Sequence, residues 1–349
     1  MKHIVHIITG LQRGGAETVL VTLATELAHA RHAYRQSVIY FKDGPLRAPL
    51  EKLGISCYQV RYVSILWLIK KLNPDIIHSS LWSATIIARL YAAIFSIPTY
   101  CALHTVSEHS GIFRNVIDAI LPFKPTKFIA VSEQVKKSYE KFLPAQKIAV
   151  IENGIPAAQP KKAMQKQDRY TIGAIGRFVP VKNYQILLDA FACVHREFPH
   201  TELVMIGHGL LEQKLREQAY RLNISDAVTF IINKPAHEWY CRFDCFVQPS
   251  AHEGFSLTAA EALQAKVPVI VTGKNKQHIF IKHEKHGLVI EPNSEQALCY
   301  ALTYYIRNPE VALNYAQAGN SYVQQHFSSA AMAQKYHILF NSNVKKDNT

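Results

Sequence analysis

Short apolar runs of strand length alternate with longer amphipathic stretches along most of this 349-residue chain, and this alternation constrains the fold more than any other feature. Continuous apolar strands are typical of a parallel sheet covered on both faces, and parallel strands need crossover helices. We therefore expect repeated βαβ units. In the first half the expected strands are Ile4–Ile8, Ser37–Phe41, Asp75–Ser79, Thr99–Leu103, Lys127–Val131 and Lys147–Ile151, with helices over Ala16–His29, Trp82–Ser96 and Glu133–Leu143.

A second series of the same kind follows a polar, lysine-rich stretch, 157–169, which lacks hydrophobic periodicity and therefore predicts an interdomain linker. A chain of this length also exceeds what one α/β core usually holds. We predict two Rossmann-like domains, residues 1–155 and 156–327, and expect a C-terminal helix, 328–349, to pack back on the first. The strands expected in the second half are Tyr170–Ile175, Glu202–Ile206, Ala227–Ile232, Cys245–Pro249, Val267–Val271 and Leu288–Ile290, followed by helices over Glu295–Arg307, Glu310–His326 and Ser329–Ser342.

The chain is basic, with a net charge of +13, and residues 1–155 carry 18 Lys and Arg against 10 Asp and Glu. Such a surface can serve nucleic acid, anionic lipid or a phosphorylated substrate, and charge alone does not choose among them. Neither an aromatic-and-basic RNA-binding motif nor a basic helical arm is evident, so we expect no nucleic-acid partner.

The sequence favours a cytoplasmic protein. Its first apolar run is interrupted by His6 and too short for a signal peptide, and the apolar stretch Leu81–Ile97 is broken by Arg89 and too short to span a bilayer. The six cysteines are scattered and most lie in apolar runs, where they are typical of core thiols. Cys241 and Cys245 lie close together but lack a second ligand pair, so no metal site is expected there.

A glycine-rich turn, Thr9–Glu17, joins the first strand to the first helix and contains Gly14 and Gly15. Such a turn lets backbone N–H groups approach an anion at a helix N-terminus, although a tight turn alone would also require glycine. The sequence of this turn matches neither the dinucleotide fingerprint nor the Walker loop.

Two cations, Arg177 and Lys182, lie in the turn Gly176–Asn183 between a strand and a helix of the second half. Open α/β sheets bind ligands at this carboxyl edge, where a guanidinium and an ammonium suit a diphosphate. Taken singly, either residue would be an ordinary surface charge. The turn Gly207–Gly209 after the next strand either brings backbone close to a ligand or is purely structural.

The most informative segment is Gln248–Leu263, in which a strand ends near Pro249 and a helix begins near Ser256. Small and hydroxylated residues at that helix N-terminus leave N–H groups and the positive end of the helix dipole available for a phosphate. Glu253 lies ahead of the helix and Glu261 lies more than one turn inside it. Their carboxylates can therefore accept hydrogen bonds from hydroxyls on two parts of one extended ligand.

The spacing of Glu253 and Glu261 resembles the E-x7-E signature of retaining glycosyltransferases, and the chain resembles glycosyltransferase family 4. The resemblance implies an α/β fold of the GT-B type, with two Rossmann-like domains whose parallel sheets face each other across an interdomain cleft. The chain departs from the family at Gln12 and Arg13, where many relatives have smaller residues. The landmarks that carry the resemblance are Gly14–Glu17, Ala130–Glu133, Asn153–Ile155, Gly176–Arg177 with Lys182, and Glu253–Glu261.

The resemblance also implies a role for each candidate residue. Arg177 and Lys182 would neutralise the diphosphate of a nucleotide-sugar donor, Glu253 would hold the sugar hydroxyls and Glu261 the ribose. In the first domain, backbone at Gly15 would face the sugar-phosphate, and His104 would lie close to the transferring sugar. The candidate catalytic residues are thus Glu253, Arg177, Lys182 and His104, and the candidate donor-binding residues are Gly14, Gly15, Gly176, Gly207, Gly254, Phe255, Ser256, Leu257 and Glu261.

The expected activity is retaining transfer of a hexose or N-acetylhexosamine from a nucleotide-sugar, for which UDP is the more frequent nucleotide in such families. The expected acceptor is a glycan or a lipid-linked molecule of surface polysaccharide, lipopolysaccharide or glycoconjugate synthesis. No Asp-x-Asp pair occurs in the sequence, so neither a metal nor another cofactor is expected. The alternatives are a non-transferring GT-B enzyme, such as an epimerase or a phosphorylase, and a non-catalytic nucleotide-sugar or nucleic-acid binding module.

Two stretches of the basic first half, Ile65–Lys71 and Ile112–Lys127, combine apolar or aromatic residues with Lys and Arg. They suit peripheral contact with an anionic membrane, which fits a lipid-linked acceptor. They suit ordinary amphipathic helices that cover a sheet equally well.

Overall fold

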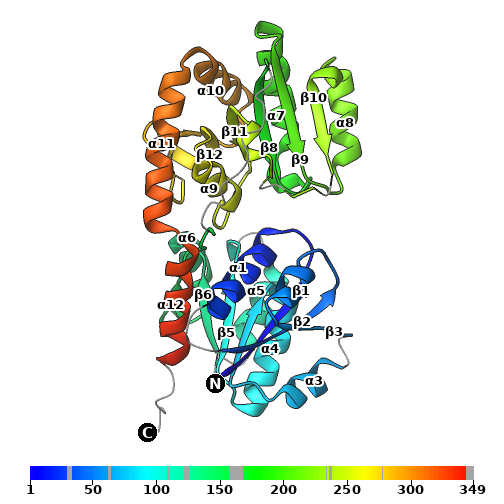
Figure 1. Ribbon diagram of the computed structural model, residues 1–349, viewed down its shortest axis with the longest axis vertical. Coiled ribbons are helices and arrows are strands. Elements are labelled where there is room, and N and C mark those ends of the chain that lie inside the picture. The colour runs from blue at the N-terminus through cyan, green and yellow to red at the C-terminus, as the bar shows by residue number, and fades with distance from the viewer. Residues whose placement is uncertain are drawn as a thin grey trace. The chain divides into compact units, whose positions relative to one another are not determined.

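The computed structural model describes residues 1–29, 34–61, 64–107, 111–121, 126–156, 168–232, 234–235, 238–276 and 278–342. The chain divides into two compact units, Met1–Pro156 together with Phe327–Thr349, and Ala157–His326. Each unit contains one sheet of parallel strands flanked by helices (Figure 1). The α/β class predicted from the alternation of apolar runs is therefore confirmed. Most of the predicted linker, residues 157–167, lies outside the described residues.

The sheet of the first unit has the strand order β3-β2-β1-β4-β5-β6-β7. One of these strands was not predicted, because β3 is short, polar at both ends and only partly buried, so it presents no apolar run. The strands are β1 (His3–Gly10), β2 (Arg35–Lys42), β3 (Ser56–Gln59), β4 (Ile76–Ser80), β5 (Thr99–Leu103), β6 (Thr126–Ala130) and β7 (Ile148–Val150).

Helices cover both faces of this sheet. One face buries Ile8 and Val38 under α1 and α2, while the opposite face buries Ile7 and Ile77 under α3 and α4. Alternate residues of each strand thus serve two separate cores, as the pleat requires. The helices of this unit are α1 (Gly15–His29), α2 (Arg47–Lys52), α3 (Ile65–Leu72), α4 (Trp82–Phe95), α5 (Ile112–Ile120), α6 (Glu133–Tyr139) and α12 (Ser329–Asn341).

The last helix, α12, completes the first unit although it comes from the other end of the chain. Its Ser329 hydroxyl donates a hydrogen bond to Glu26 of α1 at 2.5 Å, and Tyr100 of β5 donates to the Leu339 carbonyl at 3.0 Å. Where the chain returns to this unit, Ile155 N–H donates to the Phe327 carbonyl at 2.8 Å and Ser329 N–H donates to the Ile155 carbonyl at 3.0 Å. The outgoing and returning segments are therefore joined to each other within the first unit.

Buried histidines line the sheet beneath α12. His6 Nδ1 lies 3.1 Å from His78 Nδ1, and His6 Nε2 lies 3.0 Å from the Gln36 side-chain oxygen. The His78 ring meets the Tyr336 ring of α12 edge to face, with 5.5 Å between centroids. Burial lowers the pKa of His6 to about 4 and holds the pKa of His78 well below its usual value, so both rings are neutral at pH 7.

The second unit contains a sheet of order β10-β9-β8-β11-β12-β13. Its core contains Phe191, Met205 and Tyr305. Cys245 and, in the first unit, Cys101 are buried thiols as predicted. The prediction is wrong for Cys193 and Cys241, which are exposed because one lies on the outer side of a helix and the other in a turn. The elements are β8 (Tyr170–Ile175), α7 (Tyr184–Glu197), β9 (Thr201–Ile206), α8 (Glu212–Arg221), β10 (Val228–Ile231), β11 (Cys245–Gln248), α9 (Leu257–Gln264), β12 (Val269–Thr272), β13 (Leu288–Ile290), α10 (Glu295–Arg307) and α11 (Pro309–His326).

The strand order of the second sheet reverses between β8 and β11. The strand that follows β8 in the chain, β9, lies on one side of it, and β11 lies on the other. The chain therefore continues in opposite directions along the sheet after β8 and after β11, and open α/β sheets form their ligand crevices at the carboxyl ends of such a pair of strands. In the part of the chain that the structure describes, no helix has the length and apolar character needed to cross a membrane.

Candidate active site

The loops that follow β8 and β11 meet at the carboxyl edge of the second sheet. The Ala251 N–H, after β11, donates a hydrogen bond to the Val181 carbonyl, after β8, at 2.8 Å. This contact brings two predicted site residues together, since Lys182 Nζ lies 2.5 Å from Glu253 Oε1. About a fifth of each side chain is exposed, 18% for Lys182 and 22% for Glu253. The pair is thus formed within the second unit and remains open to a ligand.

A buried glutamine holds the Glu253 carboxylate in place. Gln248, the last residue of β11, donates a hydrogen bond from Nε2 to Glu253 Oε1 at 2.6 Å. Burial alone would raise the pKa of Glu253, but the Lys182 ammonium and the Gln248 hydrogen bond outweigh it, so the pKa is lowered. Glu253 is therefore ionised at pH 7 and can only accept hydrogen bonds.

Among the residues that the structure describes, no side chain caps the first turn of α9. Ser256 occupies the N-cap position, but its hydroxyl donates to the Gln248 side-chain oxygen instead of accepting from the helix. The N–H groups that begin at Leu257 are left for another acceptor, and the positive end of the helix dipole adds to them. Gly254 and Phe255, just before this turn, are buried, and the Phe255 ring packs 5.3 Å from the Phe280 ring.

Glu261, one turn inside α9, is held by a tyrosine. Tyr240 lies in the turn before β11 and donates its hydroxyl hydrogen to Glu261 Oε2 at 2.7 Å. Burial, and then the charge of Glu261, hold the pKa of Tyr240 well above its usual range. The hydroxyl therefore stays protonated and continues to donate.

Arg177 and the two glycine turns of the second unit lie at the same edge. The Arg177 side chain is exposed and has no hydrogen-bonding partner within the described ranges. A Cβ at Gly207 would overlap the Gly176 carbonyl oxygen, and Phe178 N–H donates to the His208 carbonyl at 2.8 Å. Close packing between these two turns therefore explains the glycine at position 207.

The remaining candidates lie at the carboxyl edge of the first sheet. Gly15 begins α1, and a Cβ there would have no neighbour within 4 Å, whereas a Cβ at Gly14 would press on the Glu17 carboxylate. A cavity of about 250 Å³ lies beside this turn and is lined in part by Gln12, Glu17 and Lys42.

His104 directly follows β5. Its Nε2 atom is buried without a hydrogen-bond partner among the described residues. Burial lowers the pKa of His104 to about 4, so the ring is neutral at pH 7.

The predicted site residues thus divide between the two units. The structure brings Lys182, Glu253 and the start of α9 together at one edge of the second sheet, with Arg177 in the same loop as Lys182. Two further residues support the carboxylates of this edge and were not predicted, namely Gln248 and Tyr240. A glutamine that ends a buried strand next to Glu253 is a usable signal, whereas nothing near Tyr240 in the sequence points to Glu261.

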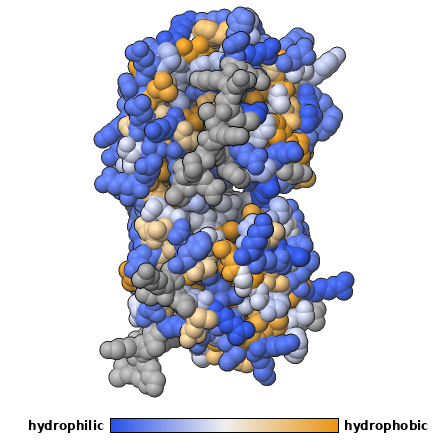
Figure 2. Space-filling model, in the orientation of Figure 1, coloured by the Kyte–Doolittle hydropathy of each residue, from blue (hydrophilic) through white to orange (hydrophobic). Residues whose placement is uncertain are grey.

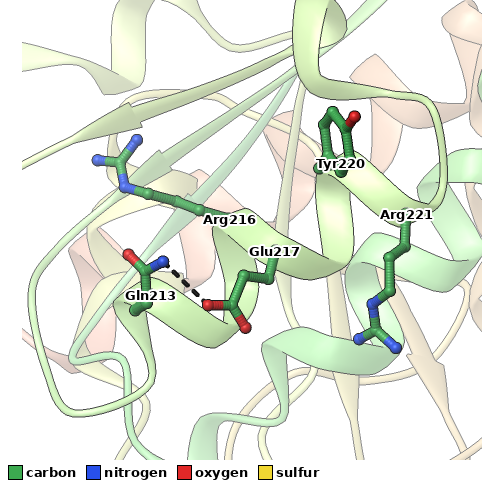
Figure 3. Close-up of a pocket in the computed structure, with 5 residues that line it drawn as sticks. All are labelled: Gln213, Arg216, Glu217, Tyr220 and Arg221. Atoms are coloured by element: carbon green, nitrogen blue, oxygen red, sulfur yellow. Dashed lines mark hydrogen bonds between the residues drawn. The ribbon is translucent and has the colours of Figure 1, made fainter.

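A second cavity lies away from this edge, on the surface of α8 (Figure 3). It measures about 470 Å³, and Gln213 Nε2 donates to Glu217 Oε1 at 2.9 Å beside it. All of its lining residues come from α8, and no candidate residue is among them. We therefore assign it no part in the site. The lining residues are Gln213, Arg216, Glu217, Tyr220 and Arg221.

Two family models match consecutive parts of the chain. The model described as Glycosyltransferase Family 4 matches residues 2–159, and the model described as Glycosyl transferases group 1 matches residues 157–322. The chain belongs to glycosyltransferase family 4. The predicted family is confirmed.

Individual relatives of this chain are also named glycosyltransferases. The putative glycosyltransferase EpsF of Bacillus subtilis is 25% identical over 309 residues, which cover 78% of this chain and 79% of EpsF. The lipopolysaccharide core biosynthesis glycosyltransferase LpsD of Rhizobium meliloti is 24% identical over 363 residues, covering 98% and 99%. Anabaena HepE, solved in complex with UDP-glucose, has a TM-score of 0.85 at 19% identity, covering 98% of this chain and 100% of HepE. The structural likeness confirms the predicted GT-B fold.

Proposed function

We propose that this glycosyltransferase moves a hexose or N-acetylhexosamine from a UDP-sugar to a glycan or lipid-linked acceptor, with retention of the anomeric configuration. One observation carries the proposal. A cation, a carboxylate and an uncapped helix start, contributed by Lys182, Glu253 and α9, converge where the strand order of the second sheet reverses. Such a crevice suits a ligand with both a diphosphate and sugar hydroxyls.

Each part of the donor has a suitable partner in this proposal. The exposed Arg177 guanidinium, the Lys182 ammonium and the N–H groups of the first turn of α9 neutralise the diphosphate. Glu253, ionised and held by Gln248, accepts hydrogen bonds from sugar hydroxyls. Glu261, held by Tyr240, accepts from the ribose. UDP is favoured as the nucleotide because HepE was solved with UDP-glucose.

The proposed chemistry needs no protein nucleophile and no metal. The bond between the anomeric carbon and the diphosphate oxygen breaks, and the acceptor oxygen bonds to that carbon on the same face. The leaving diphosphate takes the proton of the acceptor hydroxyl. Lys182, Arg177 and the dipole of α9 stabilise the charge that develops on the diphosphate, a form of electrostatic catalysis that typically contributes about 10² to 10³ in rate per contact.

The acceptor side of the proposal draws on relatives. LpsD carries the name of a lipopolysaccharide core enzyme, and this supports an acceptor from lipopolysaccharide or another surface polysaccharide. We place the reaction in the cytoplasm, at the membrane surface, because a lipid-linked acceptor would be met there. Peripheral contact with anionic lipid is therefore part of the proposal.

A ligand panel followed by product analysis tests the proposal. The protein is incubated with UDP-, GDP- and ADP-sugars, and UDP-sugars should raise its melting temperature most. A ligand at 100 times its Kd stabilises the folded protein by about 2.7 kcal/mol. Transfer to an acceptor glycan should give a product with the donor's anomeric configuration by NMR, at a rate that EDTA leaves unchanged. An inverted product, or release of an epimerised nucleotide-sugar without acceptor, would contradict the proposal.

A further inference from the structure

Three neighbouring helices, α3, α4 and α5, form one outer layer of the first unit. Helices α3 and α4 share a buried core with the sheet through Ile65, Leu68 and Ala88. Helix α5 is fastened to α4 by the buried ion pair of Arg89 with Asp118, whose Nη1 and Oδ1 atoms are 2.9 Å apart. The outward sides of the three helices therefore belong to the same face of the unit.

This layer exposes large apolar side chains on all three helices. Scattered exposed apolar residues are ordinary, but contiguous ones mark interaction sites. Figure 2 shows hydrophobic surface over the part of the first unit that Figure 1 draws as α3 and α4. The exposed side chains are Leu66 (46%) and Trp67 (64%) on α3, Leu90 (43%), Ile94 (67%) and Phe95 (45%) on α4, and Phe113 (74%), Val116 (47%) and Ile120 (77%) on α5.

Helix α5 buries polar residues and exposes apolar ones, which is the reverse of a normal surface helix. Its polar residues Asn115 and Asp118 are buried, 6% and 4% exposed, whereas Phe113 and Ile120 point outward. Asn115 donates to the Ser107 carbonyl at 3.2 Å, and Asp118 accepts from Arg89. The polar side of α5 is therefore bonded to the interior of the protein, and the apolar side faces outward, where it is available to a partner.

The charge of this layer selects the partner. Within the described parts of these helices, every exposed ionisable side chain is basic, namely Lys70, Lys71 and Arg114. Lys71 Nζ lies 5.1 Å from the centre of the Trp67 ring, so a cation and an exposed aromatic ring occupy the same spot. Aromatic and aliphatic side chains beside Lys and Arg are the composition of surfaces that lie on anionic bilayers. A symmetric dimer through this layer would instead bring together two faces that lack acids.

We propose that the outer layer of α3, α4 and α5 docks on an anionic lipid bilayer. Phe113, Ile120 and Ile94 enter the boundary between headgroups and acyl chains, and Lys70, Lys71 and Arg114 contact lipid phosphates. The inference rests on the proposed function only in that a lipid-linked acceptor would be met at the same surface. Both stretches that the sequence suggested for membrane contact contribute, and α4 joins them; residues 122–125 of the second stretch lie outside the described residues.

Vesicle co-sedimentation of the full chain tests the apolar contribution. The probes are phosphatidylcholine vesicles with and without phosphatidylglycerol. Wild type should bind only the anionic vesicles, and the combined Phe113→Gln and Ile120→Gln variant should lose most of that binding. Glutamine preserves helix propensity, so the fold should be kept. The matched control combines Tyr300→Gln and Leu313→Gln, which are 73% and 51% exposed on the second unit. This control should bind like wild type.

The charge contribution has its own pair of variants. Lys70→Glu with Lys71→Glu should lower partitioning into anionic vesicles by about tenfold or more, since each lysine near the surface contributes about fivefold. Lys214→Glu with Lys285→Glu makes the same charge change on exposed residues of the second unit and should have a much smaller effect. Equal losses in both pairs would show attraction by net charge alone and would overturn the proposal.

Two further readouts separate the possible failures. Light scattering that finds a dimer in wild type and a monomer in the Phe113 and Ile120 variant, with vesicle binding unchanged, would assign the layer to a second copy and overturn the proposal. UDP-sugar binding by thermal shift should be the same in every docking variant. Absence of UDP-sugar binding in wild type would contradict the proposed function without affecting the vesicle result.

Discussion

Lys182 Nζ and Glu253 Oε1 lie 2.5 Å apart, although the two residues belong to loops that follow different strands. The cation assigned to the diphosphate and the carboxylate assigned to the sugar therefore neutralise each other before any donor arrives. A bound diphosphate would compete with Glu253 for the ammonium. Removing one partner leaves the other partly buried and uncompensated, so the two residues should respond differently to substitution.

Glu253→Gln should lower kcat/KM for sugar transfer by about 10² to 10³ while UDP binds at least as tightly as to wild type, because Lys182 is then released to the phosphates. Lys182→Ala should weaken both UDP binding and transfer. Calorimetric titration with UDP and steady-state kinetics measure the two effects. Equal weakening of UDP binding in both variants would contradict the separate assignments, and Lys214→Ala, on the surface of α8, serves as the control.

Tyr240→Phe should weaken the binding of UDP and of UDP-sugar by the same factor, because the hydroxyl holds Glu261 and Glu261 is assigned to the ribose. A hydrogen bond to a charged group contributes about 1.5 to 3 kcal/mol, so some loss of stability should accompany the change. Tyr305→Phe is a suitable control, since its buried hydroxyl donates to the Val269 carbonyl at 3.1 Å within the same unit. It should lower stability and leave nucleotide affinity unchanged. If Tyr240→Phe weakened the binding of UDP-sugar but not of UDP, Glu261 would have to contact the sugar instead of the ribose.

Gln248→Leu should lower kcat/KM by about tenfold or more, because it removes the donor to Glu253 and the acceptor for Ser256 in one step. The main effect should fall on binding of the sugar, measured as a larger rise in Kd for UDP-sugar than for UDP. Gln213→Leu removes a side-chain amide on the surface of α8 and should leave the kinetics unchanged, so it serves as the control. Normal kinetics in Gln248→Leu would show that Glu253 needs no such support.

Acidification should destabilise the first unit through its buried histidines. His6 has a pKa of about 4 in the folded state against 6.5 when unfolded, so the unfolded chain binds protons first as the pH falls. Stability is therefore full above pH 6.5 and is lost between pH 6.5 and about 4, by up to about 1.4 kcal/mol per pH unit for each such histidine.

Chemical denaturation at pH 7, 6, 5 and 4.5 measures this slope. His6→Gln should reduce it, because the titrating group is gone. An equal slope in wild type and His6→Gln would assign the acid sensitivity to other groups.

Local patterns predicted the fold and drew attention to two carboxylates, for a physical reason. Strands buried on both faces must be apolar throughout, and the spacing of Glu253 and Glu261 lies within a single strand, loop and helix. The contacts of Gln248 and Tyr240 could not be predicted, because they depend on which atom each side chain reaches in the folded protein. Tyr240 and its partner Glu261 are 21 positions apart in the sequence. The burial of the polar side of α5 could not be predicted for the same reason. Asn115 and Asp118 look like solvent-facing residues until Ser107 and Arg89 are placed beside them.

The hydrogen bonds between Ile155 and the segment that begins α12 have a consequence for how the protein is made. The ribosome synthesises nearly all of the first unit early, but α12, which covers His78 and bonds to Glu26, emerges only after the second unit. The earlier part of the first unit must wait, with His78 not yet covered by Tyr336, until the second unit has left the ribosome. The second unit is continuous in sequence and can fold during that interval, so we expect the domain that is synthesised second to be completed first.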